Sequence, residues 1–249
     1  MLSKNQIKYI QSLHQKKYRQ QHGAFLVEGA KSVQEVLQSN FEIELVVATE
    51  VFYKENVRLT DHQRTPVEIA SPADLERIGT LESNNAALAV VRTKQNRPLV
   101  ADPEEIVLIL DDIRDPGNLG TILRIADWYG IRKILCSETT ADVYNPKVIS
   151  ASKGSFTRVS WWYGDIVQFL AQQPNLPVYG AFLDGEDVHT LSFGSGGYLV
   201  MGNESNGIRP EVEAFVTQKV TIPRYGEAES LNVGIATAVL LDNWRRELT

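Results

Sequence analysis

Residues 229–246 read ESLNVGIATAVLLDNWRR and predict the helix around which the fold is organised. Ser230 is a favourable N-cap, and Asn232 would lie in the first turn, where unpaired backbone N–H groups carry partial positive charge. Apolar residues follow at helical spacing, at Leu231, Val233, Ile235, Ala236, Val239, Leu240 and Trp244. The preceding run VTIP, at 220–223, predicts a strand. A strand end, a loop and a polar helix start would form the floor of a ligand site, although a capped final helix without a ligand shows the same pattern.

The alternation of strand and helix extends upstream to residue 106. The run IVLIL at 106–110 is continuously apolar, as in a strand covered on both faces. Further strands are expected at 133–137, 158–162, 178–183, 198–201 and 220–223. Helices are expected at 119–129, 146–152, 165–172 and 210–218, before the final helix. This pattern predicts an α/β fold with a mostly parallel sheet, and ligands of such sheets bind at the carboxyl ends of the strands. The loops 111–118, 202–207 and 223–230 are therefore the candidate site.

A smaller α/β unit is predicted before this sheet. Strand patterns lie at 25–27, 44–48, 66–70 and 86–93, with helices at 31–37 and from Pro72 onward. Residues 94–104 are polar and contain proline, which is typical of a linker. The expected organisation is an N-terminal domain at 1–93, a linker at 94–104 and a C-terminal domain at 105–249.

The first helix pattern, at residues 3–22, carries cations and no acid. Ser3 is a favourable cap for it. Its cations are Lys4, Lys8, Lys16, Lys17 and Arg19. The segment is either a solvated amphipathic helix or an arm that faces RNA phosphates, because clustered Lys and Arg supply sequence-independent affinity for nucleic acid.

Composition narrows the class of protein. The 249 residues are 43% hydrophobic and 22% charged, no apolar run approaches the length of a membrane span, and the N-terminus lacks an apolar signal core. Cys136, the single cysteine, lies in the apolar run KILC and is expected to be a buried strand residue. The histidines show no ligand spacing. A net charge of −6 argues against a generally basic surface but leaves room for a local basic patch. We expect a cytoplasmic protein with no metal and no membrane contact.

The first candidate loop leads into a helix at DPGNLGTILRIADWYG, residues 115–130. Asn118 is predicted to cap this helix. Arg124 falls on the face opposite the apolar residues, so it does not belong to the predicted core. It is either an ordinary surface arginine or a guanidinium aimed at a phosphate or carboxylate.

The second candidate loop is in YLVMGNESNGI, residues 198–208. Gly202 ends a predicted strand, and Gly207 closes the polar stretch after it, which suggests a tight turn with backbone close to a ligand. Glu204, the acid in this loop, is a turn residue or a partner for arginine. GxGxxG after a strand and GxxxxGK[ST] are both missing from the sequence, which argues against dinucleotide and P-loop sites.

Together these stretches resemble the SpoU/TrmH type of RNA ribose 2′-O-methyltransferase, within the SPOUT superfamily. The pattern from Asn118 to Arg124 (NLGxxxR) resembles the first family motif, and residues 202–207 resemble the second. Ile222-Pro223 with 230–233 (SLNV) resembles the third. The stretch FLVEGAKSVQEVL, at 25–37, is similar to the L30e-like substrate-binding domain of the family. Departures are Gly234, where serine is frequent, and Ser205, where glycine is frequent.

The resemblance implies a C-terminal domain with a deep trefoil knot, a homodimer with a shared active site, and S-adenosylmethionine as cofactor. Backbone around Gly202, Ile222 and Leu231 would hold the cofactor. The reaction would be methyl transfer to a ribose 2′-hydroxyl of ribosomal RNA, with transfer RNA as the alternative. Arg124 would grip a phosphate and orient the ribose, with a role as base left open. Asn118, Ser230 and Asn232 would position Arg124 and the hydroxyl, and Glu204 would brace its loop or fix Arg124.

Three other classes stay open at this point. A SPOUT enzyme that methylates a base is disfavoured because Arg124 and the 230–232 turn resemble the ribose-type pattern. An RNA-binding protein without catalysis is disfavoured because all five polar positions of the motifs are intact. A nucleotide-binding oxidoreductase is disfavoured because it lacks the glycine fingerprint.

Overall fold

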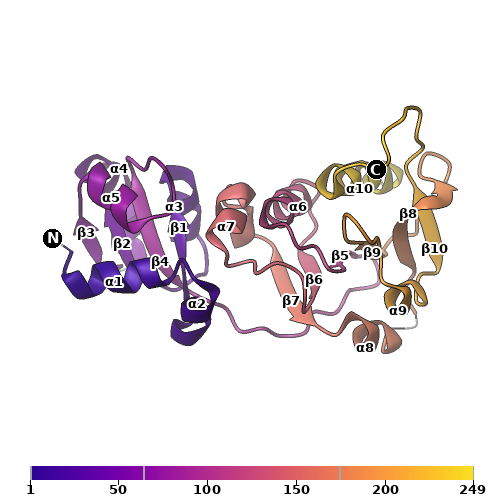
Figure 1. Ribbon diagram of the computed structural model, residues 1–249, viewed down its shortest axis with the longest axis horizontal. Coiled ribbons are helices and arrows are strands. Elements are labelled where there is room, and N and C mark those ends of the chain that lie inside the picture. Colours follow the sequence, from indigo (N-terminus) through magenta and orange to yellow (C-terminus); the bar gives the residue numbers. More distant parts are fainter. Residues whose placement is uncertain (1, 64, 174, 249) are drawn as a thin grey trace. The chain divides into compact units, whose positions relative to one another are not determined.

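The computed structural model describes residues 2–63, 65–173 and 175–248, which form two compact units (Figure 1). The N-terminal unit comprises Met1–Gln95 together with Asp142–Thr157. The C-terminal unit comprises Asn96–Ala141 and Arg158–Thr249. No helix in the described ranges is long and apolar enough to cross a membrane.

The N-terminal unit is built on a four-stranded sheet in the order β1-β4-β2-β3. Its strands are β1 (Ala24–Glu28), β2 (Ile43–Ala48), β3 (Val67–Ile69) and β4 (Ala87–Arg92). β4 runs antiparallel to β1 and β2, and β2 runs parallel to β3. The helices are α1 (Lys4–Ser12), α2 (Lys16–His22), α3 (Ala30–Leu37), α4 (Glu50–Gln63) and α5 (Pro72–Ile78). All elements expected in this unit are present, and α4 is an addition to them.

The cationic segment at the N-terminus folds as two helices. Ser3 caps α1 with a capping box, as predicted, and α1 buries Ile10 and Leu13 in the core. Arg19 is 3% exposed, forms an ion pair with Asp142 at 2.7 Å and donates to the carbonyl groups of Leu13 and His14. The inclusion of Arg19 among phosphate-facing cations is therefore wrong, because its guanidinium is already committed inside the unit.

Residues 142–157 complete the core of the N-terminal unit. They contain α7 (Pro146–Ser152), which packs against β1, and the short helix η1 (Ser155–Thr157). The rings of Tyr144 and Phe156 lie 4.6 Å and 6.1 Å from that of Phe25, and Phe41 joins the same cluster. The segment therefore covers β1 with aromatic surface, although the chain reaches it only after passing through part of the C-terminal unit.

The C-terminal unit is built on a six-stranded sheet in the order β10-β8-β9-β5-β6-β7, with every neighbouring pair parallel. The strands are β5 (Ile106–Leu110), β6 (Lys133–Ser137), β7 (Ser160–Gly164), β8 (Val178–Asp187), β9 (Gly197–Met201) and β10 (Gln218–Thr221). The helices are α6 (Pro116–Trp128), α8 (Ile166–Ala171), α9 (Pro210–Glu213) and α10 (Val233–Glu247). The predicted parallel sheet is confirmed. Every residue of β5 and β9 is buried, which explains their continuous apolar runs.

The order of this sheet reverses between β5 and β9. From β5 the chain proceeds outward to β6 and β7, whereas β8, β9 and β10 lie on the other side. Ligands of parallel sheets bind outside the carboxyl ends of the strands at such a switch point. The loops that follow β5, β9 and β10 begin at this edge, which is where the sequence motifs lie.

Two predicted helix caps are wrong. Asp115, with Pro116 after it, caps α6, and its carboxylate accepts from the backbone N–H of Asn118 at 2.8 Å. Proline suits the first helical position because it has no N–H to leave unpaired, so α6 begins earlier than expected. Asn232 rather than Ser230 caps α10, accepting from the N–H groups of Gly234 and Ile235.

Candidate active site

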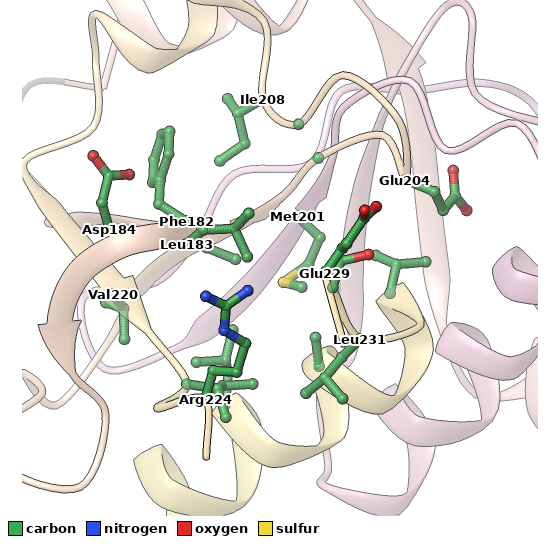
Figure 2. Close-up of a pocket in the computed structure, with 18 of the residues that line it drawn as sticks. Phe182, Leu183, Asp184, Met201, Glu204, Ile208, Val220, Arg224, Glu229 and Leu231 are labelled. Carbon is green, nitrogen blue, oxygen red and sulfur yellow. The ribbon is translucent and has the colours of Figure 1, made fainter. Parts of the chain in front are cut away.

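A cavity of about 640 Å³ opens at the carboxyl ends of β8, β9 and β10 (Figure 2). Gly202, Ile222 and Leu231, the three residues predicted to hold a cofactor, all line it, together with Glu204 and Ser230. Apolar side chains also contribute to the lining, among them Met201, Val220, Ala236 and Leu240. The volume lies within the range of about 300–1,000 Å³ that small-molecule sites occupy.

A chain of side-chain hydrogen bonds joins the three motifs. The Nδ2 of Asn232 donates to the Oδ1 of Asn118 at 2.9 Å, and the Nδ2 of Asn118 donates to the Oε1 of Glu204 at 2.7 Å. Asn232 also caps α10, so its own orientation is fixed by the helix. The structure therefore brings Asn118, Glu204 and Asn232 together. Of these, Glu204 lines the cavity, whereas Asn118 and Asn232 do not.

Arg124 stands apart from this hydrogen-bonded chain. It is exposed on α6, as the helical projection predicted, and its guanidinium makes no hydrogen bond or ion pair within the part of the chain that the structure describes. It does not line the cavity. The guanidinium is thus available for a ligand outside the cavity. Of the two roles expected for Glu204, bracing its loop or fixing Arg124, the structure shows no contact with Arg124 and shows one with Asn118.

The reason for glycine at position 202 differs from the one that the sequence suggested. A Cβ atom on Gly202 would lie 2.3 Å from the backbone of Gly207 and Ile208. The small residue is therefore required by the approach of the loop to itself. Gly207 has φ +69°, which favours glycine, and it exchanges backbone hydrogen bonds with Asn203. The tight turn is confirmed, and its close neighbour is protein backbone.

The sequence did not predict an ion pair next to this loop, between the buried Asp111 and the partly exposed Arg209. Asp111, at the end of β5, is fully buried and accepts from the backbone N–H of Arg209 at 2.8 Å and from its guanidinium at 2.7 Å. This hydrogen bond raises the pKa of Arg209 above its ordinary value. The pair fixes the end of the 202–208 loop to the central strand. The sequence shows Asp111 directly after an apolar run, but no local pattern identifies Arg209 as its partner.

Gly234, a departure from the resembled motif, lies where α10 meets α6. A Cβ atom there would be 3.1 Å from the Cγ2 of Thr121, which is tighter than ordinary contact. The glycine therefore permits close packing of the two helices that carry Asn118 and Asn232. Among the residues described, no group of three His, Cys, Asp or Glu side chains is arranged to hold a metal ion.

Comparison with known proteins agrees with this arrangement. Residues 105–242 match the SpoU rRNA Methylase family, and residues 4–89 match the MRM3-like substrate binding domain. The 23S rRNA (guanosine(2553)-2′-O)-methyltransferase RlmP of Bacillus subtilis is 28% identical, over 98% of this chain and 97% of that protein.

Two solved structures are similar over nearly the whole chain. One, from Porphyromonas gingivalis, is described as an RNA methyltransferase of the TrmH family; it is 39% identical, covers 99% of both chains and has a TM-score of 0.88. The other is the AdoMet-bound rRNA methyltransferase of Sinorhizobium meliloti, 27% identical over 100% of this chain and 97% of that one, with a TM-score of 0.89. The chain belongs to the SpoU rRNA methylase family.

Proposed function

We propose that this protein transfers a methyl group from S-adenosylmethionine to a ribose 2′-hydroxyl of ribosomal RNA. The observation that carries the proposal is the hydrogen-bonded chain from Asn232 through Asn118 to Glu204. It gathers the polar residues of three separate loops beside a cavity of suitable size. The relative from Bacillus subtilis, named for ribose methylation of 23S rRNA, supports the substrate class.

The cavity suits a cationic cofactor. Its lining contains the carboxylates of Asp184, Glu204, Glu213 and Glu229 and the apolar side chains of Met201 and Leu231. Carboxylates favour the sulfonium and ammonium groups of S-adenosylmethionine, and the apolar surface suits its adenine ring. Backbone at Gly202, Ile222 and Leu231 would hold the molecule. When bound, the cofactor supplies an electrophilic methyl group.

The polar residues then have distinct tasks. Arg124 is exposed and lacks a partner among the described residues, so its planar fork is available to bind an RNA phosphate and orient the adjoining ribose. Asn118 and Asn232 fix one another and set the positions that the hydroxyl can occupy. Ser230 lines the cavity, where its hydroxyl would help to position the ribose. Glu204 braces the loop through Asn118. Positioning of this kind contributes much of the rate of a transfer reaction.

RNA binding would involve the N-terminal domain, which we propose spans 1–93, with a linker at 94–104 and the methyltransferase domain at 105–249. The family matches at 4–89 and 105–242 support this division, although the compact units assign 142–157 to the N-terminal unit. The exposed lysines of α1 and α2 provide a phosphate-binding surface. They are Lys4, Lys8, Lys16 and Lys17.

We further propose a homodimer in the cytoplasm whose protomers share their active sites, and a trefoil knot in the C-terminal domain. Helices α6 and α10 pack together and leave two large apolar side chains exposed, Trp128 at 83% and Ile235 at 56%. A dimer interface on these helices would cover both side chains. A shared site also accounts for Arg124 lying outside the cavity of its own chain. Light scattering should give twice the mass of one chain, and Trp128→Arg should halve it.

The function is tested by mapping. Ribose 2′-O-methyl groups are mapped by mass spectrometry in ribosomal and transfer RNA from cells with and without this protein. Purified protein and tritiated S-adenosylmethionine then label the same RNA made without modification. One ribosomal position should lose its methyl group in cells and regain it in vitro. Labelling confined to transfer RNA would contradict the ribosomal assignment, and labelling of a base would contradict the reaction.

A further inference from the structure

We propose that Arg224 recognises the carboxylate of the cofactor's amino-acid moiety and so distinguishes S-adenosylmethionine from its decarboxylated form. This inference rests on the proposed function. It concerns a residue in the candidate loop 223–230, between the two halves of the third motif, to which the sequence analysis gave no role.

Arg224 is the one basic side chain among the described residues that line the cavity. Four acids line it as well, Asp184, Glu204, Glu213 and Glu229. In Figure 2 the guanidinium of Arg224 extends into the cavity, whereas Asp184 and Glu204 lie at opposite sides of the view. A single cation in an acidic lining creates one place where a ligand's negative group is favoured and leaves the rest to positive groups.

The guanidinium is not committed to those acids. Within the described ranges, Arg224 forms no ion pair, and its one hydrogen bond, to the carbonyl of Ala228, is 3.5 Å long. By contrast, Glu204 accepts from Asn118 and Glu213 pairs with Lys219 at 2.6 Å. Arg224 therefore keeps nearly all its donors available, and a guanidinium binds a carboxylate with two parallel hydrogen bonds.

The charges of the ligand complement this arrangement. S-adenosylmethionine carries a sulfonium, an ammonium and one carboxylate. The acids of the lining favour the first two groups, and Arg224 alone favours the third. The decarboxylated compound has the same adenosine and sulfonium but nothing for Arg224 to bind, so the guanidinium would only repel it. A phosphate of the RNA is the other anion that Arg224 could meet, and the two sources give different results below.

The test compares two ligands on matched variants by isothermal titration calorimetry. Arg224→Met removes the charge at similar length. Arg132→Met is the control, because Arg132 is exposed in the same unit and does not line the cavity. Arg224→Met should weaken S-adenosylmethionine binding by about tenfold. This is the lower end of the affinity change expected from losing a charge-assisted hydrogen bond, because the side chain is exposed to solvent. Its affinity for the decarboxylated ligand should stay the same or rise. Arg132→Met should change neither affinity.

Four results overturn the proposal. An equal loss of affinity for both ligands means that Arg224 supports the shape of the cavity and does not bind the carboxylate. RNA is titrated into the same variants, and unchanged cofactor affinity with weakened RNA binding assigns the guanidinium to an RNA phosphate. If the parent protein binds neither ligand, the proposed function fails together with this inference. If the parent binds both ligands and Arg224→Met binds them with the same affinities, only the role of Arg224 is contradicted. Thermal unfolding of each variant identifies any loss that comes from misfolding.

Discussion

The side-chain amide of Asn118 donates a hydrogen bond to the carboxylate of Glu204 at 2.7 Å, across 86 positions of sequence. This contact ties the first turn of α6 to the loop after β9, and Asn232 extends it to the cap of α10. The contact constrains both the start of α6 and the loop after β9, so a substitution of Asn118 should also affect the position of Glu204, and the reverse.

Asn118→Ala should lower the rate of methyl transfer by at least about a hundredfold through lost positioning. The free energy of unfolding should change by less than about 0.5 kcal/mol, because the side chain is not buried. Glu204→Gln is the comparison variant: its amide oxygen still accepts from Asn118, so its single-turnover rate at saturating cofactor should fall less than that of Asn118→Ala. Single-turnover rates and thermal unfolding check both variants. An Ala variant with the parental rate would show that the contact has no catalytic role.

Arg124→Ala should likewise cost little stability, because the side chain is exposed. Turnover should fall at least about a hundredfold if Arg124 orients phosphate and ribose. Arg124→Lys should not restore it, because a point charge cannot reproduce a planar fork. Affinity for S-adenosylmethionine, measured by calorimetry, should stay at the parental value. Methylation at the parental rate, or a loss explained by unfolding, would contradict this role.

Replacing Lys4, Lys8, Lys16 and Lys17 by Ala should weaken RNA binding and reduce its dependence on salt, because fewer counterions are released. Cofactor affinity should not change. Arg19→Ala is the contrasting variant: it leaves Asp142 without its partner and should destabilise the N-terminal unit by about 3 kcal/mol. RNA titrations at several salt concentrations and denaturant unfolding separate the two effects. A salt dependence identical to that of the parent would identify the lysines as simply solvated.

Gly202→Val should abolish cofactor binding, because a Cβ atom there would lie 2.3 Å from the backbone of Gly207 and Ile208 and displace the loop. The overpacking should cost about 1–3 kcal/mol while leaving the protein folded. At Gly207 a Cβ meets nothing within 4 Å, so Gly207→Ala suffers only the strain of its positive φ, about 1 kcal/mol. Gly207→Ala should keep its affinity. Unchanged affinity in the Val variant would remove the loop from the site.

Burial raises the pKa of the Cys136 thiol from its ordinary 9.0 to about 12. The folded state therefore favours the neutral thiol, and its contribution to stability is present below pH 9 and is lost progressively as the pH rises toward 12. Iodoacetamide at pH 8 should label the protein only after denaturation. Rapid labelling of native protein would show that β6 opens or that Cys136 is accessible.

Much of the C-terminal sheet could be predicted because buried parallel strands have continuous apolar sequences that can be recognised locally. The strands at 106–110 and 133–137 have the predicted bounds, and so does the helix at 146–152, although that helix belongs to the N-terminal unit. The caps of α6 and α10 were misplaced because several residues in each loop are good caps, and local chemistry does not rank them. Of the polar residues predicted for the site, Asn118, Glu204 and Asn232 form one hydrogen-bonded chain, whereas Arg124 lies apart from it. The pairing of Asn118 with Glu204, of Asp111 with Arg209 and of Arg19 with Asp142 depends on tertiary geometry, which no local pattern encodes.

The return of residues 142–157 to the N-terminal unit has a consequence for biosynthesis. The ribosome releases β1 to β4 before it has made Tyr144 and Phe156, which pack around Phe25, or Asp142, which neutralises Arg19. For the seconds that translation of the intervening residues takes, the nascent unit has an uncovered aromatic surface and a guanidinium without its carboxylate partner. During that interval a nascent-chain chaperone could bind this surface. The interval ends when residue 157 has left the ribosome and the segment 142–157 can pack.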